Sequence, residues 1–345
     1  MAIKDRGSLD ASMKGGGGLT VEDVFSTYVY TGNGTTQDIV NGIDLATDGG
    51  MVWTKGRYAD HHYLFDTERG ATKLIYSHLT NAETTSVNTL TSFNTDGFSV
   101  GTETGINNNT KEYASWTFRK APRFFDVVKY TGNGVAGREI AHNLGCDVGM
   151  IVVKKTTGAA SNWMVYHKST TATDYLALNL TDASTPLLAI WNDTNPTDAV
   201  FSLGDSFHSN QTGDEYIAYL FADDPLGASG DGSDGMIACG SYVGDGLVDG
   251  LEIDLGWEPQ YILIKSSTLT RSWIIHDTMR GITSGGNDAL LYANGSDAEY
   301  DLSDRLSVTA SGFKITTTNT EHNSNGATYI YMAIRNGLNP LGIKL

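Results

Sequence analysis

The sequence predicts an all-β protein with three tandem homologous β-sandwich domains of jelly-roll type, preceded by a glycine-rich N-terminal arm. One observation is a five-residue signature that occurs three times. It reads Tyr-Thr-Gly-Asn-Gly at residues 30–34 and 130–134, and Tyr-Val-Gly-Asp-Gly at residues 242–246. The other observation is the composition, with 40 glycines among 345 residues, 40% hydrophobic residues and only 18% charged residues. This composition is typical of short strands separated by turns, and it is too hydrophobic for a disordered chain.

Later landmarks keep their spacing from each signature. An apolar run ends in a lysine 23 to 25 residues after the opening tyrosine, at Lys55, Lys154 and Lys265. The next landmarks are a run that begins at Tyr63, Trp163 or Trp273, a strand that contains Phe98, Phe201 or Phe313, and a closing strand at 113–119, 216–222 or 329–335. Four landmarks in register indicate a repeat of about 100 residues. A unit of that length can bury its own core, so the pattern favours whole domains over the turns of a solenoid.

The elements of the first repeat follow from local patterns. Residues 26–30 alternate as an edge strand does, and residues 32–34 have turn chemistry. The remaining predicted strands are 38–45, which enters a bend, the fully buried 51–54, then 63–65, 87–93, 98–100 and 113–119. Each repeat thus offers roughly seven to nine short strands and no long helix, as expected for a β-sandwich.

The predicted boundaries divide the chain into five parts. They are an N-terminal docking arm at 1–27, β-sandwich repeats at 28–122, 123–224 and 236–345 (the last with a short tail), and a Gly/Asp linker at 225–235. Four glycines at 15–18 predict a flexible joint in the arm, and the alternative is a disordered terminus. Thr20 and Asp23 have the spacing of a loose capping box, which predicts a short helix or a lead-in strand.

The junctions between the repeats differ in composition. Only Ala121 and Pro122 separate the first repeat from the second, which predicts a rigid or semi-rigid contact. The linker at 225–235 is rich in glycine and aspartate, which predicts a mobile joint or a long loop.

Charge and hydropathy argue against several classes of protein. The net charge is −17 at pH 7, so the surface repels phosphate backbones and nucleic-acid binding is not expected. No window approaches the roughly 18 apolar residues of a membrane span, and residues 1–20 lack the apolar segment of a secretory signal. We therefore expect synthesis in a cytoplasm. Cys146 and Cys239 occupy non-equivalent positions in different repeats, which predicts two free, buried thiols.

Three polar motifs could carry chemistry, and each has a simpler interpretation. Asp66 with Arg69, and Asp277 with Arg280, could clamp a substrate; their recurrence favours a turn fixed by a charge-assisted hydrogen bond. The adjacent residues His61 and His62 would point to opposite faces of a strand, which disfavours a shared metal. Asp231 and Asp234 could bind calcium, but the linker lacks EF-hand spacing and a plain loop is favoured.

We expect no enzyme activity and no cofactor. The sequence contains no nucleophile elbow, no zinc-protease motif and no phosphate loop, and with 40 acidic residues chance carboxylate pairs carry no information. Aromatic residues at the repeat landmarks are expected in the core. Trp191 has no counterpart in the other repeats, so it is the one candidate ligand-binding residue.

Five of these landmarks together resemble a domain repeated in virion structural proteins of tailed bacteriophages, especially marine phages and cyanophages. The matching segments are residues 30–34, 51–55, 66–70, 94–98 and 116–122, and the resemblance extends over about residues 20–336. It implies a non-enzymatic part of the virion, assembled in the host cytoplasm, and a homo-oligomer such as the trimer that fibres often form. It transfers no catalytic residue. Ala222 departs from the pattern, since Arg119 and Arg335 occupy the equivalent positions.

Three hypotheses about function follow. The first is a tail-fibre or appendage protein that docks through its N-terminal arm to a tail adaptor, connector or capsid and presents its sandwiches to the host surface. The second is a head or neck decoration protein. The third, from a different class, is a module that binds or degrades a surface glycan.

Overall fold

The computed structural model describes residues 18–248, 250–282, 286–301 and 303–337. Within these ranges the chain forms 25 β-strands, all paired antiparallel, and four helices of four residues each. The predicted all-β class is confirmed. No helix in the described part of the chain is long and apolar enough to cross a bilayer. Residues 1–17 of the predicted docking arm lie outside the described residues.

The first repeat contains two main sheets. The larger has the order β1 (Phe25–Thr31), β9 (Glu112–Arg119), β3 (Gly50–Gly56), β4 (His62–Asp66), and the smaller β2 (Gln37–Val40), β8 (Gly97–Val100), β7 (Leu90–Asn94). The short strands β5 (Lys73–Leu74) and β6 (Thr84–Thr85) pair at the edge. The helices are α1 (Val21–Val24), α2 (Leu45–Asp48) and α3 (Thr104–Asn107).

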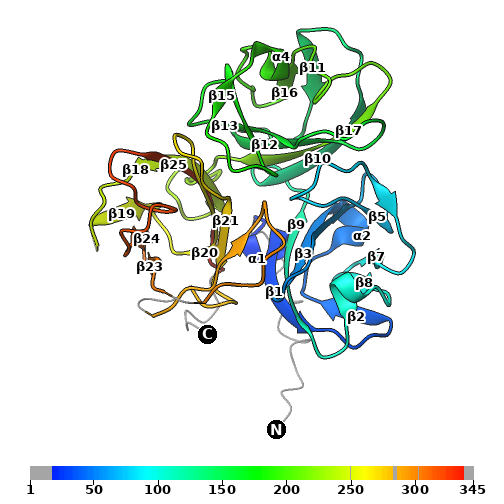
Figure 1. The fold of residues 1–345 in the computed structure, drawn as a ribbon, viewed down its shortest axis with the longest axis horizontal. Helices are drawn as coiled ribbons and strands as arrows, with labels where there is room; N and C mark the ends of the chain where they lie inside the picture. The colour runs from blue at the N-terminus through cyan, green and yellow to red at the C-terminus, as the bar shows by residue number, and fades with distance from the viewer. Residues whose placement is uncertain (1–17, 249, 283–285, 302, 338–345) are drawn as a thin grey trace.

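The second and third repeats use the same strand order. In the second repeat, the large sheet has the order β10 (Phe125–Thr131), β17 (Glu215–Ala222), β12 (Val148–Lys155), β13 (Met164–His167), β14 (Asp174–Ala177), β15 (Thr185–Pro186). The small sheet pairs β11 (Arg138–Ala141) with β16 (Val200–Leu203). Helix α4 (Leu188–Trp191) lies between β15 and β16 in the chain. In the third repeat, the large sheet has the order β18 (Ile237–Val243), β25 (Thr328–Arg335), β20 (Pro259–Ser266), β21 (Ile274–Asp277), β22 (Leu291–Tyr292). The small sheet has the order β19 (Leu251–Asp254), β24 (Gly312–Ile315), β23 (Leu306–Thr309). Figure 1 shows the three sets of strands as three lobes that meet at the centre of the molecule.

Strand pairing corrects the sequence alignment of the first repeat by one residue. Met51 pairs with Asp66, Met150 with His167 and Tyr261 with Asp277. Counting four residues back from each partner shows that His62, and not Tyr63, is the counterpart of Trp163 and Trp273. The sequence comparison matched aromatic residues by type, whereas the register is set by the pairing with the preceding strand.

The large sheets are buried on both faces. All seven residues of β3 are buried, as predicted for 51–54. Val52 packs with residues of the small sheet of its own repeat, such as Phe98, because side chains alternate across a strand. Met51 and Trp53 point the other way, into a core that contains residues of all three repeats.

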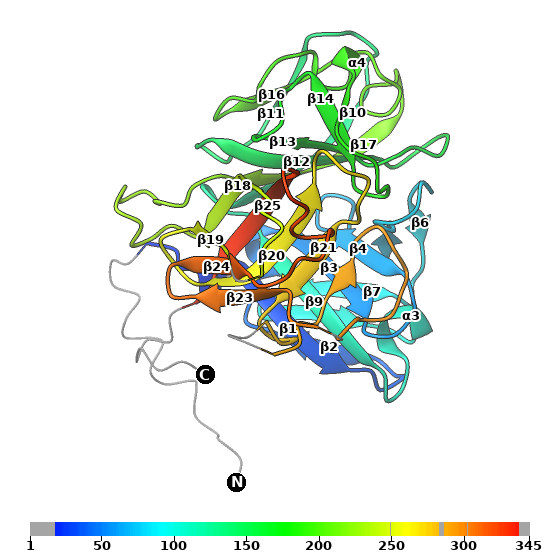
Figure 2. The same ribbon diagram turned by 60° about the vertical axis from the view of Figure 1, so that its left-hand side comes forward.

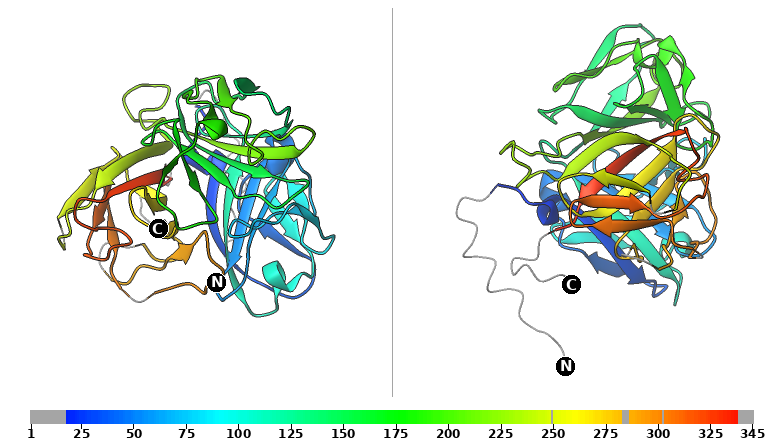
Figure 3. Two further views of the ribbon diagram at one scale, coloured as in Figure 1. Left: turned by 45° about the horizontal axis from the view of Figure 1, so that its top comes forward. Right: turned by 90° about the vertical axis from the view of Figure 1, so that its left-hand side faces the viewer.

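This shared core fills the centre of the molecule. A void of only about 10 Å³ remains at the point where the three large sheets meet. Its lining is apolar and comes from all three repeats: Met51, Trp53, Leu64 and Phe118; Met150, Val152, Leu178, Tyr219 and Phe221; and Tyr261, Leu263 and Met332. Figures 2 and 3 show the same convergence from other directions. The contact predicted between the first two repeats is therefore part of a larger one that also includes the third.

Residues 18–27, which precede the first predicted repeat, are part of the fold. Thr20 donates its main-chain N–H to the Asp23 carboxylate at 2.9 Å, which fixes the predicted capping box, and helix α1 follows. Val21, Val24 and Phe25 are buried in the shared core, so the fold begins before the predicted boundary at residue 27. The other end of the fold lies beside α1, because a Cβ on Gly337 would be 2.3 Å from the Glu22 carboxylate.

The linker at 225–235 forms a long loop that arginine side chains hydrogen-bond to the rest of the fold. Arg335 donates hydrogen bonds of 2.9, 2.9 and 3.2 Å to the carbonyls of Gly232, Ser233 and Gly235. Arg123 donates to the Gly227 carbonyl at 2.9 Å. Arginines from the closing strand and from the start of the second repeat thus hold the loop at both ends.

Candidate functional site

The repeated signature has an architectural role. In each copy the tyrosine is buried, stacks on the first tyrosine of the closing strand, and donates its hydroxyl to a main-chain carbonyl at 2.7–2.8 Å. The donor and acceptor pairs are Tyr30 with Ile106, Tyr130 with Ser209, and Tyr242 with His322. The first glycine of the signature is required by space. A Cβ at Gly32, Gly132 or Gly244 would lie 2.1–2.4 Å from a main-chain oxygen.

Three buried asparagines hold the signature loops, and the sequence analysis missed them. Asn107, Asn210 and Asn323 each accept a hydrogen bond of 2.8–3.0 Å from the main-chain N–H of the fourth signature residue. Each also donates to a carbonyl of the preceding loop at 2.7–2.9 Å. All three lie six residues before the first tyrosine of the closing strand. That constant spacing was visible in the sequence and could have identified them.

A main-chain contact that occurs three times helps to join the repeats. In each case an N–H after the third strand of one repeat donates to a carbonyl of a neighbouring repeat at 2.9 Å. The pairs are Asp60 with Ser296, Ser161 with Thr80, and Arg271 with Thr181. The first repeat thereby binds the third, the second binds the first, and the third binds the second, which closes a ring.

A second contact of the ring uses the landmark tryptophans. Trp163 donates its indole N–H to the Tyr76 carbonyl at 3.1 Å, and Trp273 donates to the Ala177 carbonyl at 2.9 Å. Trp163 and Trp273 are thus core residues that also join repeats. His62 takes their place in the first repeat, where it lies beside the main chain of Tyr292.

The three landmark lysines are fully buried beside these contacts. Lys154 donates to the Thr80 carbonyl of the first repeat at 2.8 Å, and Lys265 donates to the Thr181 carbonyl of the second repeat at 3.1 Å. Lys55 donates to two carbonyls of its own turn, those of Gly56 and Tyr58, at 2.6 and 2.7 Å. Burial lowers the pKa of Lys55 and Lys265 to about 8 and that of Lys154 to about 7.

Lysines with lowered pKa values can act as nucleophiles or bases in enzymes. Here the residues Lys55, Lys154 and Lys265 are each 0% exposed and donate to main-chain carbonyls. A substrate has no route to these amines, and their arrangement supports the joining of turns and repeats.

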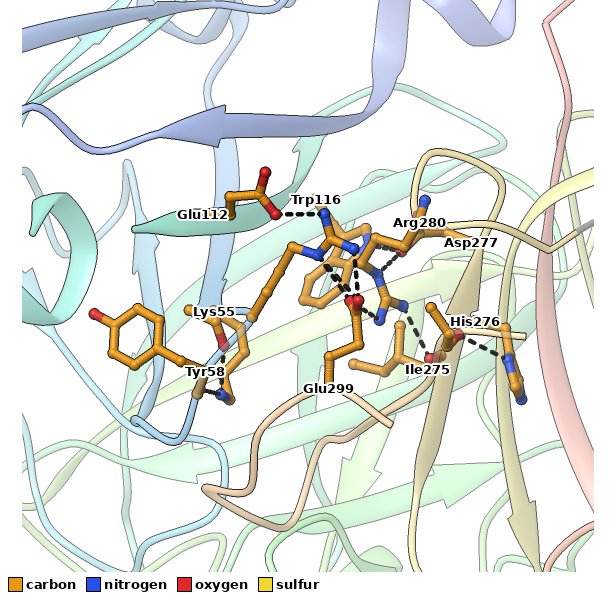
Figure 4. A network of polar contacts seen from close by, with 12 residues as sticks. Lys55, Tyr58, Glu112, Trp116, Ile275, His276, Asp277, Arg280 and Glu299 are labelled. Atoms are coloured by element: carbon orange, nitrogen blue, oxygen red, sulfur yellow. Dashed lines mark hydrogen bonds and ion pairs between the residues drawn. The ribbon is translucent and has the colours of Figure 1, made fainter. Parts of the chain in front are cut away.

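A buried charged network lies between the third and first repeats (Figure 4). Arg280 contacts the Asp277 carboxylate at 2.5 Å and Glu299 at 3.3 Å. Trp116 of the first repeat donates its indole N–H to Asp277 at 3.0 Å, and Arg57 contacts Glu299 at 2.6 Å. The side chains of Asp277 and Arg280 are 0% exposed, so these interactions act with little solvent screening.

An equivalent network joins the first repeat to the second. Asp66 and Arg69 are in contact at 2.6 Å, and Tyr219 of the second repeat donates its hydroxyl to Asp66 at 2.7 Å. The Arg69 N–H also donates to Asp66 at 2.9 Å, which is the turn that the sequence favoured over a substrate clamp. His167 replaces the aspartate in the second repeat, and its Nε2 lies 3.0 Å from the Tyr331 carbonyl of the third.

Several histidines are buried, and two of them, His62 and His167, contact a neighbouring repeat. In the first repeat, Nδ1 of His61 lies 2.8 Å from Nε2 of His78. At the equivalent positions of the second repeat, Asn179 donates a hydrogen bond to Asn162. His62 accepts the indole N–H of Trp53 at 2.9 Å, so His61 and His62 have different partners. Burial lowers the pKa values of several of these histidines: that of His78 and His167 to about 4, that of His322 to about 3, and those of His62 and His276 well below the ordinary range.

The aspartates of the 225–235 loop, considered in the sequence as a calcium site, have hydrogen-bond partners within the protein. Among the described residues, no group of three or more His, Cys, Asp or Glu side chains is placed to hold a metal ion. In the 225–235 loop, Asp231 accepts hydrogen bonds from Ser233 N–H at 2.9 Å and Ser229 Oγ at 2.7 Å. Hydrogen bonds from Ser233 and Ser229 lower the pKa of Asp231 to about 2. The plain-loop interpretation accounts for this geometry.

Trp191, the candidate ligand residue, lies in the core. It is 2% exposed, and its ring packs edge-on against Tyr166 with the centroids 6.1 Å apart. The expectation that it stacks on a ligand does not agree with this placement, because neither face of the ring is open. Trp191, which has no counterpart in the other repeats, thus fills space in the core of its own repeat. Cys146 and Cys239 are free thiols, as predicted, with Cys239 buried and Cys146 half-buried.

The comparison with known families gives one match. The model of a family described as a domain of unknown function (DUF7483) matches residues 20–337. The chain belongs to this family. The match spans all three repeats as one unit, in keeping with the ring of contacts that joins them. The comparisons with curated proteins and with solved structures gave no match.

The charged network predicts a large effect of Asp277→Ala. The substitution leaves the buried Arg280 without its closest carboxylate and removes the acceptor of Trp116, so we expect the free energy of unfolding to fall by about 3–5 kcal/mol. Denaturant unfolding measures this value. The matched control is Glu215→Gln, which breaks a half-exposed ion pair with Lys129 and should cost less than about 1 kcal/mol. Equal, small effects of both substitutions would show that the network does not support the fold.

The buried histidines predict a loss of stability in mild acid. Their pKa values are lower in the folded protein than the roughly 6.5 of an unfolded chain, so the unfolded state binds protons first as the pH falls. The contribution of the histidines to the free energy of unfolding should be complete above about pH 6.5 and should be lost from there toward pH 4. The buried lysines act at higher pH, because their folded pKa values of about 7 and 8 lie below the ordinary value of 10.5. His167→Gln removes one such proton and should flatten the decrease by up to one proton, whereas an unchanged slope would contradict the assignment. Denaturant unfolding across this pH range provides the measurement.

Proposed function

We propose that the chain is a non-enzymatic structural protein of a tailed-bacteriophage virion, as a component of a tail fibre or similar appendage. The resemblance of its landmarks to repeated virion domains suggests the setting. The observation that carries the proposal is the closed ring of junction contacts. The side chains best suited to chemistry, such as Lys154 and Asp277, are buried and paired at the junctions, where they stabilise a rigid unit.

We further infer that the chain comprises three homologous β-sandwich repeats of jelly-roll type, at 28–122, 123–224 and 236–345, the last with a short tail. The strand order common to the three segments and the junction contacts at equivalent positions support this arrangement. Three copies of one domain around a common centre resemble a trimer made within a single chain. Assembly of several chains into a fibre, such as a trimer of chains, remains part of the proposal.

The position of the chain ends suggests how such a protein would be attached. Glu22 and Gly337 lie side by side, so both ends of the described fold emerge from one place. The second repeat forms the upper lobe in Figure 1, above the first and third repeats. Docking through the N-terminal arm to a tail adaptor or connector would leave the second repeat free to face the host surface.

Cryo-electron microscopy of the intact virion tests this proposal. We expect density for the three-lobed unit on the tail, with residues 1–27 against an adaptor protein. The same density on the head or collar would contradict the fibre role and support the alternative of a decoration protein. Particles that lack the unit altogether would contradict both roles.

A further inference from the structure

A pocket in the third repeat is separate from the junction contacts. It has a volume of about 260 Å³. Asp288, Leu290 and Tyr292, at and just before the edge strand β22, form one side. Tyr300, Ser303 and Arg305 from the returning chain form the other side.

The pocket lies where the third repeat has a longer connection than the other two. Leu64 pairs with Ile75 and Val165 with Leu176, eleven residues further on in both cases, whereas Ile275 pairs with Leu291, sixteen residues further on. The connection that leads to the edge strand is therefore five residues longer in the third repeat. The pocket is therefore a local addition to the common fold.

The residue opposite the edge strand also differs among the repeats. Leu74 pairs with Thr84 and Tyr175 with Thr185, whereas Leu290 pairs with Tyr300. Tyr300 is 40% exposed, and its ring centroid lies 5.4 Å from that of Tyr292, with the planes inclined at 59°. A threonine on the first two repeats has thus become an exposed aromatic ring at the wall of a pocket.

Polar groups of the pocket are held in place by the fold. Asp288 is 1% exposed and accepts the main-chain N–H groups of Arg305 and Leu306 at 2.6 and 2.8 Å. Arg305 donates its Nε–H to Ser303 Oγ at 2.8 Å. A carboxylate, a hydroxyl and a guanidinium therefore line a cavity that also has an aromatic wall.

We propose that this pocket binds one ring of an uncharged pyranose sugar. The volume lies just below the roughly 300–1,000 Å³ of typical small-molecule pockets, which suits a single ring. An exposed tyrosine offers an apolar face for the C–H groups of a sugar, and the polar residues offer donors and acceptors for its hydroxyl groups. The pocket is lined by one carboxylate, that of Asp288, and one guanidinium, that of Arg305, so their charges balance, which suits an uncharged sugar. The inference concerns the chain itself and does not depend on its place in a virion.

Saturation-transfer NMR with the full chain tests the proposal. The probes are the methyl glycosides of glucose, galactose and N-acetylglucosamine, with methyl glucuronide as the charged comparison. We expect saturation transfer to at least one uncharged glycoside. Tyr300→Thr restores the residue of the other repeats and should weaken binding about tenfold, whereas Tyr300→Phe keeps the ring and should bind like the wild type.

A second variant guards against misfolding of the first. Arg305→Gln removes the guanidinium while it leaves the aromatic wall intact, and it should also weaken binding about tenfold. Thermal unfolding establishes that each variant is folded. The proposal is overturned if no uncharged glycoside receives saturation, if methyl glucuronide binds more tightly than all of them, or if binding persists unchanged in both Tyr300→Thr and Arg305→Gln.

Discussion

The burial of both faces of each large sheet is the constraint on which the rest of the structure depends. One face packs on the small sheet of its own repeat, and the other packs on the large sheets of the other two repeats. Met51, Met150 and Tyr261 occupy matching positions around the central void. Because apolar burial is the main favourable term in folding, separating the repeats would expose a large apolar surface on each of them.

Burial of this kind makes an unpaired charged or polar group at the junctions costly. At one equivalent position of the ring the repeats supply partners with different residues. The first and third use an aspartate and an arginine and receive an N–H or O–H from a neighbour, whereas the second uses His167 and a neighbouring carbonyl. The geometry of the ring is thus retained while its chemistry varies, which suits a structural role.

Local patterns in the sequence predicted the strands and turns well, because alternation, glycine spacing and buried apolar runs are local consequences of the fold. The ring could not be predicted, since it depends on contacts between residues such as Trp116 and Asp277 that lie far apart in the chain. The offset at His62 escaped notice because pairing, and not residue type, sets the register. Trp191 was misplaced for a related reason: its uniqueness in sequence gave no information about its burial. The pocket of the third repeat lies at a longer connection that only the strand pairing reveals.

Differential scanning calorimetry of the full chain tests the central claim most directly, namely that the three repeats form one cooperative unit. If the shared core and the junction ring hold the repeats together, unfolding is a single transition with a ratio of calorimetric to van't Hoff enthalpy of about 1. Repeats that fold independently would give separate transitions, or one broad transition with a ratio approaching about 3, and would contradict the account.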